Sequence, residues 1–333
     1  MAGDGLVGAR RAHRLSERFQ AAIAPYALLI VLLFMAVGFS LLLPDIFPTL
    51  GNLSAMLNAQ AILLILGLAV TLPLRAGDFD LSIAATMLLS AITTGILTAH
   101  LQIPFGLAII ASLCVGLAVG AINGTLIVVV GIDAFITTLG MQTILEGIGY
   151  AFTSSQQIYG IPMALQNVVR FPIFGLPAVV YTGWILGAIL FYVYQFTPFG
   201  RHLLFVGGNR EAARLAGVAV RRTRFMAFTA AAVMAAIAGV LLVGALGAVD
   251  PSAGPLYLLQ PYAAAFLGTT VIQIGRFNVL GTIIGLYLLI VGVTGLELMG
   301  APSWVAEVFN GSALVAAVIF AHVTARHAPG QHR

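Results

Sequence analysis

Ten apolar stretches of about 20 residues each follow one another along this chain of 333 residues, and they limit its possible folds more than any other feature. About 20 apolar residues of helix cross the hydrocarbon core of a bilayer. Because lipid offers the backbone no hydrogen bonds, we expect these stretches to be helices and not strands. The expected spans are residues 22–43, 54–74, 80–99, 104–129, 134–153, 176–196, 224–246, 257–273, 277–298 and 303–323. The eighth is short and is interrupted by Pro261, so we expect a tilted or partly re-entrant segment there.

The composition agrees with a lipid environment. Hydrophobic residues make up 60% of the chain and charged residues only 8%, whereas a soluble domain carries about a quarter charged residues. The expected fold class is therefore all-α, a polytopic transmembrane helix bundle. Every basic residue is arginine, and the absence of lysine excludes a Walker A phosphate-binding loop. His-Glu-x-x-His and Cys-x-x-Cys motifs do not occur either, so we expect no catalytic residue, no cofactor and no metal site.

The arginines predict the orientation of the spans, because positive residues concentrate in cytoplasmic segments. With ten crossings and the N-terminus inside, the outer segments hold only Arg170. The inner segments hold Arg10, Arg11, Arg14, Arg18, Arg75, Arg201, Arg210, Arg214, Arg221, Arg222, Arg224, Arg276, Arg326 and Arg333. We expect a cytoplasmic segment over residues 1–20, a transmembrane domain over 21–323 with a cytoplasmic connection over 197–223, and a cytoplasmic tail over 324–333. Both termini are then cytoplasmic.

The connection over residues 197–223 contains the signals of a short helix. Asn209 is a good N-cap, and Glu211 falls in the first turn, where negative charge is favoured. Gly217 is placed to end the helix in a left-handed turn. A small apolar face is formed by Ala212, Leu215 and Ala216. This helix could dock in a groove on a partner protein, or it could be a solvated loop helix held near lipid headgroups by its arginines.

Two carboxylates, Asp78 and Asp80, flank the cytoplasmic start of the third span. A carboxylate there can cap free backbone N–H groups and interact well with the helix dipole, and Arg75 is close enough in sequence to pair with it. A part in a gate, or in contact with an ATPase, is the alternative. The Asp-x-Asp spacing alone is only weak support for a metal.

Polar side chains within the spans are costly in lipid and mark either a pathway or hydrogen bonds between helices. Gln142 and Glu146 are four residues apart and share one face of the fifth span, with Thr138 one turn earlier. Together with Asn123 they are the candidates for lining a central pathway; interhelical hydrogen bonding is the alternative.

Gly116, Gly120 and Gly124 recur at every fourth position of the fourth span. They place a flat stripe on one helix face, which predicts a close crossing with another helix.

Several motifs, in order, resemble one bacterial family. Gly207-Gly208-Asn209 through Gly217-Val218 resembles the coupling segment of ABC-importer permeases of the ribose/xylose/arabinose class, and Ala76-Gly77-Asp78-Phe79-Asp80-Leu81-Ser82 resembles their Gly-Gly-Ile-Asp-Leu-Ser segment. The block from Asn123-Gly124 to Ala134–Met141 is similar as well, whereas Ile274-Gly275-Arg276 departs from the family's glycine-rich pattern. The resemblance implies that an ATPase is contacted by Gly208, Asn209, Glu211, Ala212, Ala213, Leu215 and Gly217.

The resemblance also implies a function and partners. The expected protein is a multi-pass permease of the bacterial inner membrane for a monosaccharide or similar small polar solute. It would work with cytoplasmic ABC ATPase subunits, a second permease subunit (identical or different) and an extracytoplasmic solute-binding protein. Alternatives are a permease for branched-chain amino acids or a nucleoside, and an ion-coupled secondary transporter in which Glu146 binds the ion. A membrane receptor or scaffold fits the coupling segment less well.

Overall fold

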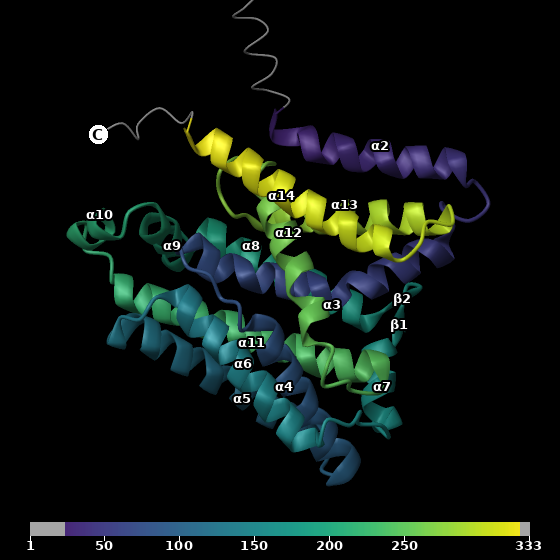
Figure 1. Ribbon diagram of the computed structural model, residues 1–333, viewed down its shortest axis with the longest axis horizontal. Coiled ribbons are helices and arrows are strands. Elements are labelled where there is room, and N and C mark those ends of the chain that lie inside the picture. Colours follow the sequence, from purple (N-terminus) through teal and green to yellow (C-terminus); the bar gives the residue numbers. More distant parts are fainter. Residues whose placement is uncertain (1–23, 327–333) are drawn as a thin grey trace, which may run out of the picture.

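The structure is a bundle of helices with one two-stranded hairpin (Figure 1). This computed structural model describes residues 24–326, and the side chains of residues 25–319. The expected segment 1–20, and the tail beyond residue 326, lie outside the described residues. The α-helices are α2 (Ala27–Leu42), α3 (Leu50–Arg75), α4 (Ile83–Gly95), α5 (Phe105–Thr125), α6 (Ala134–Thr153), α7 (Met163–Arg170), α8 (Ala178–Phe196), α9 (Pro198–Gly208), α10 (Arg210–Leu215), α11 (Val220–Leu246), α12 (Leu259–Gly268), α13 (Val279–Leu298) and α14 (Trp304–Arg326). The hairpin pairs β1 (Pro172–Ile173) with β2 (Leu176–Pro177).

Each expected span coincides with a helix, and the ends differ by a few residues. The π-helical turns η2 (Ile96–His100) and η3 (Leu126–Val130) extend α4 and α5. Six of the described helices are long and apolar enough to cross a membrane: α3, α4 with η2, α5 with η3, α8, α11 and α13. The all-α bundle is therefore confirmed.

The eighth span differs from its expected form. It consists of a 3-10 turn, η4 (Gly254–Tyr257), followed by the ten-residue α12. At 1.5 Å per residue α12 covers only about 15 Å, which is half of a hydrocarbon core. The expectation that Pro261 interrupts this segment is wrong: Pro261 is the third residue of α12, where a backbone N–H has no partner within the helix, and the break precedes it.

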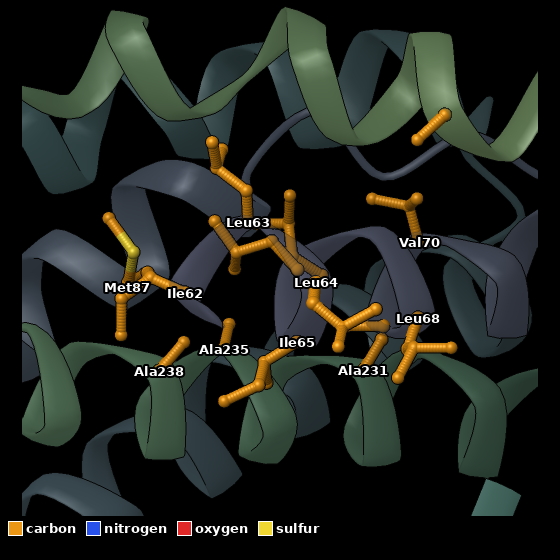
Figure 2. Packing of buried hydrophobic residues seen from close by; sticks show 14 of the residues in the cluster. Ile62, Leu63, Leu64, Ile65, Leu68, Val70, Met87, Ala231, Ala235 and Ala238 are labelled. Carbon is orange, nitrogen blue, oxygen red and sulfur yellow. The ribbon is translucent and has the colours of Figure 1, made fainter. Parts of the chain in front are cut away.

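Helix α3 forms the centre of the bundle. All of its residues from Gln60 to Arg75 are buried. Figure 2 shows Ile62 of α3 beside Met87 of α4, and Ile65 of α3 facing the alanine-rich face of α11. That face contains Ala231, Ala235 and Ala238, and such small residues let two helices approach closely.

The glycine stripe of α5 forms the predicted close crossing. It faces α11. A methyl group on Gly116 would lie 2.6 Å from Cβ of Ala236, and one on Gly120 would lie 2.7 Å from Cα of Thr229. Both distances are too short for real atoms, so packing explains these glycines.

The connections between helices gather at two ends of the bundle. At one end, which contains α9 and α10, Arg75 donates a hydrogen bond to the carbonyl of Phe277 (3.0 Å). At the other end, which contains α7 and the hairpin, Ile158 pairs with Val249 and Ser54 donates to the carbonyl of Gly175 (3.3 Å). We call these the foot end and the hairpin end; they lie on opposite sides of Figure 1.

The α5–α11 crossing yields a first prediction. Gly120→Leu should destabilise the protein by about 1–3 kcal/mol or more, because the new side chain has no space against α11. The control is Gly106→Leu on the same helix, where nothing lies within 4 Å of the added Cβ. Thermal unfolding of the purified proteins in detergent measures both. Equal melting temperatures would contradict the crossing.

Candidate coupling site and pathway residues

Two short helices at the foot end, α9 and α10, are defined by local capping. The Thr197 hydroxyl accepts a hydrogen bond from the N–H of Gly200, and Pro198 occupies the first helical position of α9. Asn209 lies between the two helices, and its Oδ1 accepts from the N–H of Ala212 (2.9 Å). Gly217 ends α10 with a φ of +81°. The expected N-cap and left-handed stop are confirmed.

Helix α10 is largely exposed. Ala213 is its only buried residue, whereas Leu215 is 79% exposed. Glu211 pairs with Arg214 at 2.6 Å, and both side chains are mostly exposed, so this pair contributes little to stability. The apolar side chain of Leu215 therefore lies on the open surface of α10.

Helix α9 packs against the connection between α3 and α4 through two glycines, Gly207 and Gly77. The Cα of Gly207 packs against Gly77, and a methyl group on Gly207 would lie 2.2 Å from the carbonyl oxygen of Arg75. The neighbouring Gly208 has nothing within 4 Å of an added Cβ. Beside this contact lies a groove of about 650 Å³, bounded by α9 and α10 on one side and Gly275–Phe277 on the other.

Asp78 holds two arginines from different elements. Arg224 of α11 donates from Nε to Oδ2 (2.7 Å) and from Nη2 to Oδ1 (2.8 Å). Arg210 of α10 donates to Oδ1 (2.7 Å) and also to the carbonyl of Gly77 (3.0 Å). The expected pairing of these carboxylates with Arg75 is wrong. Arg75 instead stacks 4.3 Å over the ring of Tyr194 and donates to Phe277, because its side chain turns toward α8 and α13.

Asp80 binds the residue before α4 and not the free N–H groups of the first turn of the helix, so the expected helix capping does not occur within the described residues. Its Oδ1 accepts from the N–H (3.1 Å) and the hydroxyl (2.6 Å) of Ser82, the residue before α4. The side chain is buried away from the arginines that bind Asp78. Burial raises the pKa of Asp80 to about 6, although the hydrogen bonds from Ser82 act in the opposite direction.

Two of the candidate pathway residues bind the connection between α3 and α4. Asn123 of α5 is fully buried and donates to the Ser82 hydroxyl (2.8 Å). Thr138 of α6 is also buried, and its Oγ1 accepts from the N–H of Leu81 (3.1 Å).

The other two, Gln142 and Glu146, remain partly exposed on α6. The amide of Gln142 donates to Glu146 Oε1 (3.1 Å), and within the described residues the buried Gln142 Oε1 has no hydrogen-bond partner. A methyl group on Gly254 of η4 would lie 3.8 Å from Glu146 Oε1, so this pair borders the break before α12.

A family described as the permease component of branched-chain amino acid transport systems matches residues 52–318. The chain belongs to this family of transport permeases. Among curated relatives, the fructose import permease FrcC of Rhizobium meliloti is 33% identical over 83% of this chain and 79% of its own length. The D-allose permease AlsC and the ribose permease RbsC of Escherichia coli are each 29% identical, over 88% and 87% of this chain and 90% and 91% of their own. No solved structure matches the chain.

These matches confirm the resemblance to sugar-importer permeases, and they establish a multi-pass transport protein of the bacterial inner membrane. Sequence reasoning missed several residues of the permease that the geometry brings together. Gly207, Arg210, Arg224 and Tyr262 all contact the α3–α4 connection. No spacing rule links them to Asp78 and Asp80, which lie more than a hundred residues away, so only the fold reveals them.

The contact between Gly207 and the α3–α4 connection yields a second prediction. Gly207→Ala should displace α9 from the α3–α4 connection and reduce transport by the permease at least about tenfold, since its Cβ collides with rigid backbone. Gly106→Ala on α5 adds the same methyl group where nothing lies within 4 Å and should keep transport within about twofold. Uptake by cells with matched membrane levels of each variant measures the difference. Similar uptake by both variants would show that the Gly207 contact is not required.

Proposed function

We propose that this chain is the membrane-spanning permease subunit of an ABC importer, and that it forms the pathway for a monosaccharide or a similar small polar solute. The observation that carries the proposal is the foot: an exposed helix, α10, whose base is joined to the centre of the bundle through Asp78 and Gly207. The printed sugar substrates of the fructose, allose and ribose relatives support the solute class. With no lysine in the chain, hydrolysis of ATP belongs to a partner subunit.

The proposed topology has ten crossings, with both termini and the foot end in the cytoplasm. The contacts at the two ends are consistent with ten crossings, since alternate connections meet at the same end. Among the described residues the hairpin end has Arg170, while the foot end has Arg75, Arg201, Arg210, Arg214, Arg221, Arg222, Arg224 and Arg276. The positive-inside rule then assigns the foot end to the cytoplasm.

The partners follow from this topology. An ABC ATPase subunit would cover the exposed face of α10, including Leu215, with Gly208, Asn209, Glu211, Ala212, Ala213 and Gly217 shaping that surface. A solute-binding protein would deliver its cargo at the hairpin end, and a second permease subunit would complete the pathway. Gln142 and Glu146 are the proposed contacts for solute hydroxyl groups, because amide and carboxylate oxygens both accept hydrogen bonds.

Reconstituted transport tests the proposal and is the third prediction. The permease, the ATPase and the binding protein encoded beside it are placed in proteoliposomes and offered labelled fructose, allose, ribose, leucine and a nucleoside. We expect uptake of a monosaccharide that requires both ATP and the binding protein. Uptake of leucine or of the nucleoside, without uptake of any sugar, would show that the solute is an amino acid or a nucleoside and not a monosaccharide. Uptake driven by an ion gradient without the ATPase would contradict the whole proposal.

The exposed foot yields a fourth prediction. Leu215→Asp should weaken co-purification of the ATPase at least about tenfold, since an apolar anchor at an interface contributes about 2 kcal/mol or more. The permease itself should remain folded, because this side chain is 79% exposed. Phe174→Asp is the control: Phe174 is 98% exposed at the tip of the hairpin, at the opposite end of the bundle. Equal recovery of ATPase with both variants would remove Leu215 from the docking surface.

A further inference from the structure

The two arginines that bind Asp78 differ in their surroundings. The Asp78 side chain is 4% exposed, Arg224 is 14% exposed and Arg210 is 45% exposed. Arg224 binds both carboxylate oxygens from the first turns of a long helix, α11. Arg210 reaches one carboxylate oxygen from α10, a six-residue helix with a single buried residue. The Arg224–Asp78 pair is therefore buried and bidentate. The Arg210–Asp78 pair is partly exposed to solvent, and Arg210 belongs to a short helix.

Because of this difference, breaking the ion pair between Arg210 and Asp78 costs less free energy than breaking the pair between Arg224 and Asp78. Breaking a buried ion pair is costly when it leaves a charge without a partner. If Arg210 leaves, Asp78 keeps both hydrogen bonds to Arg224, and the freed guanidinium is already partly hydrated. A hollow of about 410 Å³, lined by Arg210, Arg221 and Asp133 among others, lies next to the cluster and gives the side chain room to move.

Residues just after Asp78 are joined to three other helices. The Tyr262 hydroxyl of α12 donates to the carbonyl of Asp80 (2.8 Å) and accepts from its N–H (3.2 Å). Thr138 of α6 and Asn123 of α5 bind Leu81 and Ser82. Thr138 is one helical turn before Gln142, which in turn binds Glu146. Hydrogen bonds therefore connect the residues just after Asp78 to α12, α6 and α5.

We propose that Arg210 is a positioning residue that transmits movement of α10 to the transmembrane helices through Asp78, while Arg224 keeps the charge of Asp78 paired throughout the cycle. This inference rests on the proposed function, because it needs an ATPase to move α10. It assigns separate roles to two arginines that bind the same carboxylate. Arg210 is required for coupling ATP hydrolysis to transport, and Arg224 is required for the stability of the foot end.

The test is the fifth prediction and uses the complete importer in proteoliposomes, with uptake and ATP hydrolysis measured together. Arg210→Ala should lower solute uptake per ATP hydrolysed at least about tenfold, while ATPase recovery and the melting temperature stay near those of the wild type. Arg214→Ala is the matched control: it removes the same charge from the same helix, but Arg214 binds only the exposed Glu211 among the described residues. This control should remain within about twofold of the wild type.

A double-variant comparison separates transmission through Asp78 from a general effect of charge. In an Asp78→Asn background, adding Arg210→Ala should cause no further loss of uptake per ATP, because Arg210 then has no carboxylate through which to act. Arg210→Lys, which keeps the charge but loses the planar fork, should retain part of the coupling and serves if the alanine variant does not fold.

Three results would overturn the inference while leaving the proposed function intact. These are normal uptake per ATP by Arg210→Ala, an equal loss with Arg214→Ala, and a loss of ATPase from the Arg210→Ala complex, which would make Arg210 a docking residue. Failure of the wild-type importer to transport with ATP would instead contradict the proposed function itself, so the two failures are distinguishable.

Discussion

The arrangement of the foot end depends on the hydrogen bonds that hold residues 76–82. These residues leave helical geometry between α3 and α4, so their backbone groups need partners that a continuous helix would have supplied. Tyr262 and Thr138 provide them, and Asn123 fixes the Ser82 side chain that Asp80 also binds. Because these partners come from three helices, the connection ties α5, α6 and α12 together at one point.

Hydropathy alone predicts much of the fold. Lipid forces each long apolar stretch to be a helix, and for this reason the expected spans and the observed helices agree closely. Capping signals are equally local, so Asn209 and Gly217 were assigned correctly. The eighth span was less predictable, since a proline favours the first turn of a helix as readily as it breaks one. Which applies to Pro261 depends on where α12 begins.

The contacts of the site could not be predicted in the same way. Asp78 binds Arg210 and Arg224, which follow it by 132 and 146 residues, and no sequence spacing encodes a contact of that range. The nearer Arg75 was a reasonable partner by sequence, but it ends α3 facing Tyr194. The sequence also does not distinguish Gly207 from the adjacent Gly208. Only the packing shows that Gly207 contacts the α3–α4 connection and that Gly208 does not.

Asp78 and Asp80 show how two identical side chains, two residues apart, take different parts in one connection. Within the described residues Asp80 forms no ion pair, and its buried carboxyl accepts hydrogen bonds from the N–H and the hydroxyl of Ser82. The Asp80 carboxyl therefore stabilises the connection locally and makes no contact with α10. Asp78 has two cations, one of them on α10, so it remains paired when either is displaced. The first carboxylate therefore fixes the connection, and the second links it to the foot.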